Sequence, residues 1–317
     1  MSENAWPRRA AVIGVGTMGS GFAQLLALAG IPTRLADASR ELAKAGRDRA
    51  IEGARRFEAD GLMPAGAAEK IAVAVSAAPS IQSAVTGADF VIEAIREDPA
   101  TKREAFAIVD GAAPAGAVIA TNTSAIPIRE LAGAFRDGSR FLGTHWFNPP
   151  QWVPCVEVIP GPDTSDAVVE RVHGLMRRLG KQPTTVGDAA GFVANRIQFA
   201  MFKEAVSVVA DGVATPEQVD EVVRASFGFR LPFFGPFKIA DMAGLDVYDG
   251  AYRALEQDLG GRFSVPEPVA KMVAGGRLGT KAGGGFFDAP PDGLPELTAR
   301  RDRSYAALSA LLEELDQ

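Results

Sequence analysis

The feature that most constrains the fold is a glycine-rich turn near the start of the chain, Gly14-Val15-Gly16-Thr17-Met18-Gly19. A short apolar run at 10–14 precedes it and predicts a buried strand, and a stretch rich in Ala and Leu at 21–29 follows and predicts a helix. A second apolar run at 33–36 predicts the next strand. Together these segments predict a strand–helix–strand unit of about 30 residues, and this context makes the glycine spacing typical of a dinucleotide-binding turn.

The glycines of this turn have separate expected roles. Gly14 permits the tight turn, Gly16 lets the backbone approach a pyrophosphate, and Gly19 lets the helix pack on the strand, while the helix N-terminus offers N–H groups to the phosphates. Asp37 lies 18 residues after Gly19, where a carboxylate binds the adenosine ribose hydroxyls and repels the 2′-phosphate of NADP. We therefore expect NAD as the cofactor, contacted by Gly14, Gly16, Thr17, Met18, Gly19 and Asp37. The alternative is a glycine turn without a ligand.

Strand and helix patterns alternate through the first part of the chain. Further strands are predicted at 88–93, 117–121, 140–144, 155–159 and 183–186. The segments 39–60 and 64–74 have helical spacing and are expected to form a projecting hairpin, and 101–112 is a further predicted helix. This alternation predicts an α/β fold with a doubly wound, mostly parallel sheet and helices on both faces.

Beyond residue 187 the strand patterns stop. Helical spacing is present at 191–212, 216–227, 236–245, 249–259 and 297–315, and the glycine-rich stretch 275–287 is expected to be a loop. We therefore expect two domains, a nucleotide-binding domain at 1–188 and an all-helical domain at 189–317.

Composition limits the expected partners and compartment. The net charge is -6 and no basic tract stands out, so we expect no nucleic-acid surface. No apolar run reaches the roughly 18 residues of a membrane span, and no leader pattern precedes the first predicted strand. The single cysteine, Cys155, is expected to be a core residue and fits a reducing cytoplasm. The two histidines, His145 and His173, lack metal-ligand spacing, so no metal site is expected.

The densest polar chemistry follows two predicted strands. Thr121-Asn122-Thr123-Ser124 comes directly after one, and Gly143-Thr144-His145-Trp146-Phe147-Asn148-Pro149-Pro150 after another. The carboxyl ends of parallel strands face the ligand crevice. Hydride transfer from an alcohol needs a base for the hydroxyl proton, and imidazole has a pKa near neutrality. His145 is therefore the candidate base, whereas His173 lies in a predicted helix without a polar motif and is expected to be structural.

Two further polar residues stand in apolar surroundings. Glu157 lies within the apolar run 153–159, where a carboxylate is unfavourable unless it is paired. Pairing with His145 would fix the imidazole tautomer and stabilise the imidazolium; the alternative is that Glu157 points to solvent from an edge strand. Asn195 begins the first predicted helix of the second domain and either donates to a substrate oxygen or has no role in the site.

Taken together, these blocks resemble the L-3-hydroxyacyl-CoA dehydrogenase family over nearly the whole chain. The order and spacing of the blocks carry the resemblance. The matching blocks are Gly14–Gly19, Asn122-Thr123-Ser124, His145 through Pro149, Val156-Glu157-Val158, Gly191–Arg196, Gly235-Pro236-Phe237 with Asp241 and Gly244-Leu245-Asp246, and the closing stretch Gly279-Thr280-Lys281-Ala282-Gly283-Gly284-Gly285-Phe286-Phe287.

The resemblance implies a Rossmann-like NAD-binding domain, a helical domain that forms a homodimer, and NAD as the oxidant. By position, His145 and Glu157 match the family's catalytic pair. Ser124 matches the serine that hydrogen-bonds the substrate hydroxyl, and Asn195 matches the asparagine that completes the site. The positions that match cofactor contacts are Asp37, Glu97, Lys102, Asn122, Ser124 and Asn148.

The sequence leaves the identity of the substrate undecided, because it departs from the family pattern. The residues after the histidine are Trp146-Phe147-Asn148-Pro149-Pro150-Gln151, where the acyl-CoA enzymes usually have Phe-Phe-Asn-Pro-Val-Pro. The arginines of the predicted hairpin either bind CoA phosphates or form a solvated face with Glu52 and Glu58; they are Arg47, Arg49, Arg55 and Arg56. The leading expectation is oxidation of a 3-hydroxyacyl-CoA. The alternatives are a non-CoA hydroxy acid or a pyridine alcohol or aldehyde, as in relatives that oxidise gulonate, carnitine or vitamin B6 degradation products, and, remotely, a non-catalytic crystallin-like protein.

Overall fold

The computed structural model describes residues 6–315 of the chain. The chain divides into two compact units, Met1–Phe202 and Lys203–Gln317. Because α8 (Ala194–Ala210) begins in the first unit and ends in the second, the domain boundary near residue 188 stays a prediction. Among the described helices, none has the length and apolarity that a membrane span requires.

The first unit is built on one eight-stranded sheet with the strand order β3-β2-β1-β4-β5-β6-β7-β8. Every neighbouring pair of strands is parallel except β6 and β7, which are antiparallel. The first six strands have the Rossmann order, which places a topological switch point between β1 and β4. The strands are β1 (Ala10–Ile13), β2 (Thr33–Ala36), β3 (Val75–Ala77), β4 (Phe90–Glu93), β5 (Val118–Thr121), β6 (Phe141–Trp146), β7 (Cys155–Pro160) and β8 (Gln182–Thr185).

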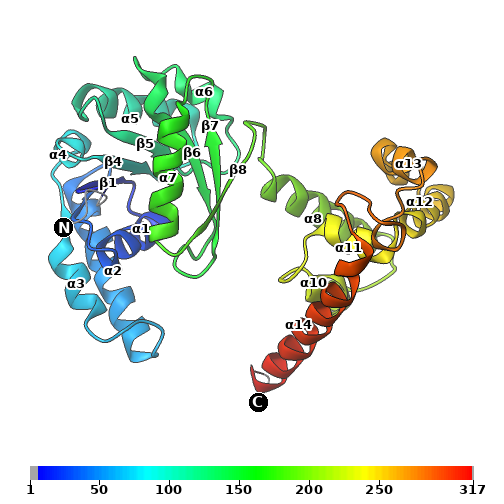
Figure 1. The fold of residues 1–317 in the computed structure, drawn as a ribbon. Coiled ribbons are helices and arrows are strands. Elements are labelled where there is room, and N and C mark those ends of the chain that lie inside the picture. The colour runs from blue at the N-terminus through cyan, green and yellow to red at the C-terminus, as the bar shows by residue number, and fades with distance from the viewer. Residues whose placement is uncertain (1–5, 316–317) are drawn as a thin grey trace. The chain divides into compact units, whose positions relative to one another are not determined.

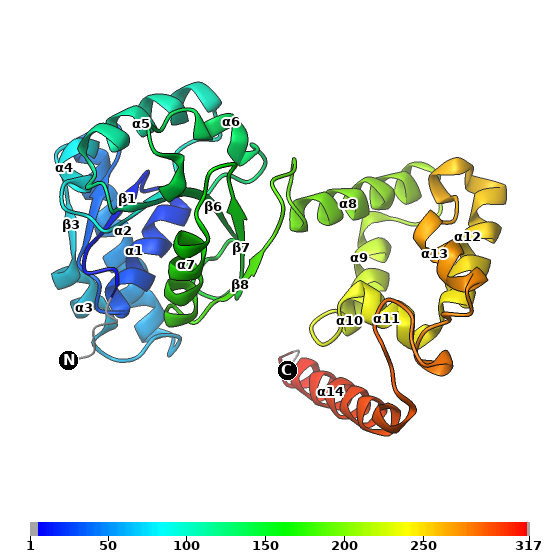
Figure 2. The same ribbon diagram turned by 45° about the horizontal axis from the view of Figure 1, so that its top comes forward.

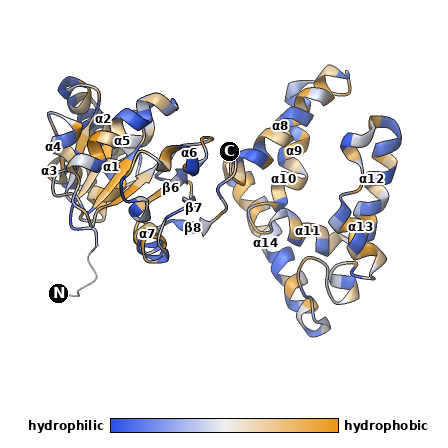
Figure 3. Cartoon of the chain, turned by 90° about the horizontal axis from the view of Figure 1, so that it is seen from above, coloured by the Kyte–Doolittle hydropathy of each residue, from blue (hydrophilic) through white to orange (hydrophobic). Residues whose placement is uncertain are grey.

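Helices cover both faces of this sheet (Figures 1 and 2). Alternate strand residues such as Val12 and Ile13 belong to two separate core clusters, one on each face. One face carries α1 (Thr17–Leu28), α2 (Arg40–Ala59), α3 (Ala67–Ala74) and α7 (Asp166–Arg178). The other carries α4 (Ile81–Val85), α5 (Pro99–Ala112) and α6 (Ile128–Ala132). Burial on both faces explains why the central strands are continuous apolar runs (Figure 3). The predicted doubly wound α/β architecture is confirmed.

The structure differs from the sequence predictions at two local points. The sequence patterns do not predict strand β3 or helix α4, because both are too short to show a clear period. Strand β6 continues through Trp146, so that His145 lies in the strand and not after it; the antiparallel pairing with β7 extends it. The two helices expected at 39–60 and 64–74 are present as α2 and α3, and Arg47 of α2 joins them by donating to the carbonyl oxygens of Ala72 and Val75, both at 2.9 Å.

The described residues of the second unit form helices without a ladder of strands. They are the end of α8, α9 (Pro216–Ala225), α10 (Phe227–Arg230), α11 (Pro236–Ala243), α12 (Leu245–Leu259), α13 (Glu267–Ala274), which the sequence patterns do not predict, and α14 (Leu294–Leu315). The glycine-rich closing stretch wraps around the buried carboxylate of Asp241, which accepts the backbone N–H groups of Phe286 at 2.9 Å and Phe287 at 2.8 Å. A Cβ on Gly285 would collide with that carboxylate, so the approach needs glycine there.

Candidate active site

The centre of the candidate site is a buried pair of side chains on neighbouring strands. His145 of β6 and Glu157 of β7 are directly opposite in the antiparallel register, and Nδ1 of His145 lies 2.6 Å from Oε2 of Glu157. The two residues are only 3% and 2% exposed. Since β8 covers the outer edge of β7, Glu157 does not point to solvent, and the structure forms the pair expected from the sequence.

The second carboxylate oxygen of Glu157 is held by the chain that leads into α8. Its Oε1 accepts the N–H groups of Val193 at 2.9 Å and Ala194 at 3.0 Å. Phe192, just before them, has a φ of 48°, which is unusual for a residue with a side chain. No sequence signal points to these two donors, because they depend on a backbone turn and not on a side-chain type.

These contacts determine the charge of Glu157. Burial raises the pKa of its carboxyl, but the hydrogen bond with His145 and the N–H groups of Ala194 and Val193 outweigh burial and hold the pKa below its usual value. The carboxylate is therefore ionised at neutral pH and accepts the Nδ1 proton of His145. This fixes the tautomer and leaves Nε2 as the nitrogen that can accept a proton.

Ser124, on the loop after β5, lies beside Asn195 at the start of α8. Asn195 donates from its side-chain amide to the backbone carbonyl of Ser124 at 2.8 Å. Asn122, two residues before Ser124, accepts the N–H of Trp146 at 3.0 Å, next to His145 in sequence. The four predicted catalytic residues thus form two bonded pairs, His145 with Glu157 and Ser124 with Asn195, and Glu157 also accepts the N–H of Ala194, the residue before Asn195.

The glycine turn has the geometry that a dinucleotide needs. Gly14 has a φ of 85°, and a Cβ on Gly19 would collide with the carbonyl oxygen of Gly14. A Cβ on Gly16 would meet no atom within 4 Å, so the backbone there is open to a ligand. The turn borders a cavity of about 600 Å³ at the β1–β4 switch point, which Asp37 also lines. Asp37 accepts the N–H of Val15 at 2.8 Å, which fixes the carboxylate at the turn.

The other predicted cofactor contacts lie in four environments. Thr17 and Asn148 line a second cavity beside α1, and Met18 packs partly buried against the core. Glu97 binds the backbone of the Ser124 loop. Lys102 is fully buried and its ammonium lies 2.7 Å from Glu93, a residue that the sequence analysis did not single out. The sequence does contain a signal for Glu93, because this carboxylate ends an apolar strand nine residues before Lys102.

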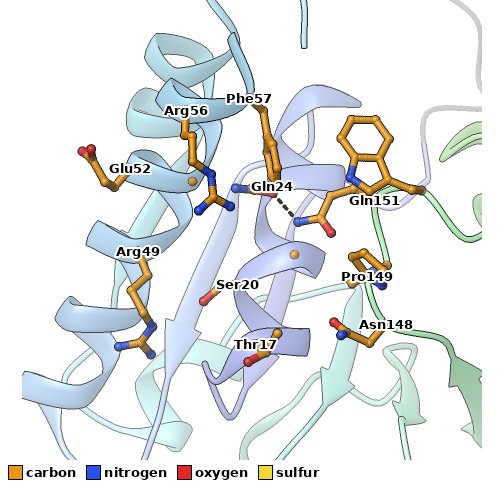
Figure 4. Close-up of a pocket in the computed structure, with 14 residues that line it drawn as sticks. Thr17, Ser20, Gln24, Arg49, Glu52, Arg56, Phe57, Asn148, Pro149 and Gln151 are labelled. Carbon is orange, nitrogen blue, oxygen red and sulfur yellow. Dashed lines mark hydrogen bonds between the residues drawn. The ribbon is translucent and has the colours of Figure 1, made fainter. Parts of the chain in front are cut away.

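The second cavity, of about 790 Å³, lies between α1, α2 and the loop after β6 (Figure 4). Arg49 and Arg56 of α2 line one wall, and the loop residues Asn148 through Trp152 line the other. Gln151 closes one side by donating to Gln24 at 2.5 Å.

The hairpin arginines divide into two groups. Arg49 and Arg56 line this cavity, and Arg49 also donates to the carbonyl of Val15 at 2.5 Å. Arg47 binds backbone carbonyls, and Arg55 is ion-paired with Glu52 at 3.2 Å on the surface. Only two of the four are therefore placed to meet a ligand in this cavity.

The other histidine and the cysteine lie outside the candidate active site. His173 bonds to Thr185 at 2.8 Å near the surface of α7. Cys155 is partly buried on β7, not fully in the core, and burial raises the pKa of its thiol. Within residues 6–315, no group of three His, Cys, Asp or Glu side chains has the geometry of a metal site.

Comparison with known proteins identifies the family. Residues 9–189 match the model of the 3-hydroxyacyl-CoA dehydrogenase NAD binding domain, and residues 191–289 match the model of the C-terminal domain of the same enzymes. The chain is 34% identical over 308 residues to a 5-formyl-3-hydroxy-2-methylpyridine 4-carboxylate 5-dehydrogenase of Mesorhizobium japonicum, covering 96% of this chain and 98% of the relative. It is 37% identical over 278 residues to a probable 3-hydroxybutyryl-CoA dehydrogenase of Bacillus subtilis, covering 87% and 96%.

A solved structure agrees with this result. The 3-hydroxyacyl-CoA dehydrogenase of Archaeoglobus fulgidus superposes with a TM-score of 0.76 at 30% identity, covering 95% of this chain and 99% of that one. The glycine turn and the cavity at the switch point fit NAD, the cofactor of the matching domain. The chain is an NAD-dependent oxidoreductase and belongs to the 3-hydroxyacyl-CoA dehydrogenase family.

Proposed function

We propose that the protein oxidises the 3-hydroxyl group of a 3-hydroxyacyl-CoA to a 3-keto group, with His145 as the general base. The observation that carries this proposal is the buried 2.6 Å contact between His145 and Glu157, because it leaves Nε2 of His145 as the proton acceptor. Bound NAD supplies the hydride acceptor for the hydrogen on C3. The hydroxyl proton goes to Nε2, and the electron pair of the O–H bond forms the new C=O bond.

Glu157 and the polar loop residues have supporting roles in this proposal. The carboxylate of Glu157 stabilises the imidazolium that forms when His145 takes the proton. Ser124 hydrogen-bonds the substrate hydroxyl, and Asn195 completes the site while binding the carbonyl of Ser124. Asp37, Asn148 and the glycine turn hold the cofactor.

A second candidate is a substrate without CoA, such as a pyridine alcohol or aldehyde. Two observations favour it. The relative that acts on a pyridine carboxylate matches 96% of this chain, and three of the four hairpin arginines, Arg47, Arg49 and Arg55, bond to other groups of the protein. The homodimer and the cytoplasmic location implied by the sequence stay predictions.

The test is NADH formation with L-3-hydroxybutyryl-CoA, compared with free hydroxy acids, carnitine, gulonate and pyridine alcohols or aldehydes. Turnover of the CoA ester above all others supports the proposal. Turnover of a free compound while the CoA ester is ignored supports the second candidate. If NAD binds and nothing in the panel is oxidised, the non-catalytic alternative gains support.

The CoA proposal makes a prediction for Arg56. Its guanidinium points into the cavity beside Gln24 (Figure 4), where it can meet an anionic group of the substrate. We expect Arg56→Ala to raise KM for the CoA ester about tenfold, the loss of one charge-assisted hydrogen bond, with little change in kcat. Arg55→Ala is the matched control, because Arg55 does not line this cavity. Equal KM values for the two variants would exclude Arg56 as a substrate contact.

Cofactor choice gives a separate prediction for Asp37. Its carboxylate repels the 2′-phosphate of NADP, and a repulsion of a few kcal/mol lowers kcat/KM with NADP about 10²-fold relative to NAD. Asp37→Asn keeps an oxygen for the N–H of Val15, which lies 2.8 Å away, but removes the charge. We expect this variant to lose most of the preference for NAD in steady-state assays with both cofactors. Equal use of NAD and NADP by the unmodified protein would overturn the role of Asp37.

A further inference from the structure

A cluster of three charged side chains, two of them buried, lies against the loop that carries Ser124. Glu93 ends β4, Lys102 lies on α5, and Glu97 lies on the segment between them (Figure 1). The side chains of Glu93 and Lys102 are each 1% exposed, and Lys102 Nζ lies 2.7 Å from Glu93 Oε1. The same ammonium lies 3.3 Å from Oε2 of Glu97, whose side chain is 37% exposed. One lysine therefore bridges an interior and an outer carboxylate.

The inner carboxylate, Glu93, is fully engaged. Its Oε1 also accepts the N–H of Ile95 at 2.6 Å, and its Oε2 accepts the hydroxyl of Thr121 at 2.6 Å. Thr121 is the last residue of β5 and faces Glu93 in the parallel register. Glu93 thus connects the ends of β4 and β5 to α5, at the edge of the sheet where the Ser124 loop begins.

The outer carboxylate, Glu97, holds that loop directly. Its Oε1 accepts the hydroxyl of Thr123 at 2.5 Å, the N–H of Ser124 at 2.7 Å and the N–H of Ala125 at 3.1 Å. Two of these bonds are to the backbone around Ser124, so they set the direction in which its side chain leaves the loop. The other oxygen of Glu97 is the one that faces Lys102.

We propose that Glu93 is a positioning residue, which fixes Glu97 through Lys102 and thereby holds Ser124 in place for the substrate hydroxyl. This role rests on the proposed function of Ser124. Without the charge of Glu93, the buried ammonium of Lys102 has Glu97 as its one nearby anion among the described residues. An ammonium that has lost a buried partner is strongly destabilised, so it moves with Glu97 toward solvent and the loop loses its anchor.

The first test is hydrogen–deuterium exchange of the full-length protein without substrate, read by mass spectrometry. In Glu93→Gln we expect peptides that contain Ser124 and Ala125 to exchange on the order of tenfold faster, with peptides of β1 unchanged. Glu69→Gln, the same chemical change at an exposed position of α3, is the matched control and leaves the Ser124 peptides unchanged. Unchanged exchange of these peptides in Glu93→Gln overturns the proposal.

The second test is a double-mutant cycle on kcat/KM with the best substrate of the panel. Glu93→Gln alone is expected to lower kcat/KM about tenfold. When it is added to Ser124→Ala, which already lacks the hydroxyl, we expect no further fall in kcat/KM, because the effects of coupled residues are non-additive. Additive effects mean that Glu93 does not act through Ser124. The exchange test needs no turnover. If no compound of the substrate panel is oxidised but the exchange changes as expected, the proposed function is overturned and the link from Glu93 to the loop stands.

A third variant separates positioning from a folding defect. Glu93→Gln combined with Lys102→Met removes both buried charges, so its Tm should recover relative to Glu93→Gln alone. We expect fast exchange at Ser124 and low kcat/KM to persist, because Glu97 still lacks its anchor. If the double variant regains both slow exchange and normal kcat/KM, the cluster only serves stability and the positioning role is wrong.

Discussion

Replacing His145 with Gln is expected to lower kcat by about 10²–10⁴-fold, the contribution of a lost general base, while NAD affinity stays close to that of the unmodified protein. Gln is preferred to Ala because its amide can still donate to the buried carboxylate of Glu157, which lies 2.6 Å from His145 Nδ1. An unpaired buried carboxylate would add a folding defect to the catalytic one. The measurement is steady-state NADH formation, with NAD titrated by protein fluorescence.

The matched control for this variant is His173→Gln. His173 bonds to Thr185 near the surface and has no contact with the described site, so the same substitution should leave kcat unchanged. Normal turnover by His145→Gln would refute the assignment of His145 as the base. Loss of NAD binding together with turnover would indicate damage to the fold instead of loss of the base.

Replacing Glu157 with Gln is expected to have the second largest effect, a fall in kcat of about 10²–10⁴-fold. The amide keeps the shape of the side chain and can still accept the N–H groups of Val193 and Ala194, which lie 2.9 and 3.0 Å from Oε1. It no longer carries the charge that stabilises the imidazolium, and its N–H group can donate to Nδ1 and favour the wrong tautomer of His145. A variant with normal kcat would show that the charge of Glu157 is not used in the reaction.

The same variant should also change the acid stability. The pKa of Glu157 is lower in the folded than in the unfolded protein, because its hydrogen bonds outweigh burial. The stabilisation is therefore complete above the unfolded pKa of about 4.3 and is lost as the pH falls through the lower folded pKa. Tm measured between neutral pH and acid should fall more steeply for the unmodified protein than for Glu157→Gln. Parallel curves would contradict the lowered pKa.

Much of the cofactor half of the site could be predicted from the sequence because its signals are local. The glycine turn and Asp37 lie within one strand–helix–strand unit, so their spacing predicts the dinucleotide-binding turn, while the pairing of β1 with β4 creates the switch point beside it. The pairing of Glu157 with His145 was also predictable, since a carboxylate inside an apolar strand needs a partner. In both cases the residue type is unusual for its local sequence pattern, and a binding or catalytic role explains its presence.

The parts that could not be predicted depend on contacts between distant segments. The N–H groups of Val193 and Ala194 reach Glu157 from more than 30 residues away in sequence, and any residue type can supply such donors. The position of His145 inside β6 depends on pairing with β7, which no local pattern reveals. Spacing alone likewise could not separate Arg56, which lines a cavity, from its neighbour Arg55, which pairs with Glu52.

The most direct test of the central claim is the transfer of hydrogen from C3 to NAD. The protein is incubated with NAD and L-3-hydroxybutyryl-CoA carrying deuterium on C3, and the NADH formed is analysed by mass spectrometry. The account predicts NADH with one deuterium atom for each 3-keto product, and almost none from His145→Gln over the same time. NADH without deuterium, or product formation at the normal rate by the variant, would contradict it.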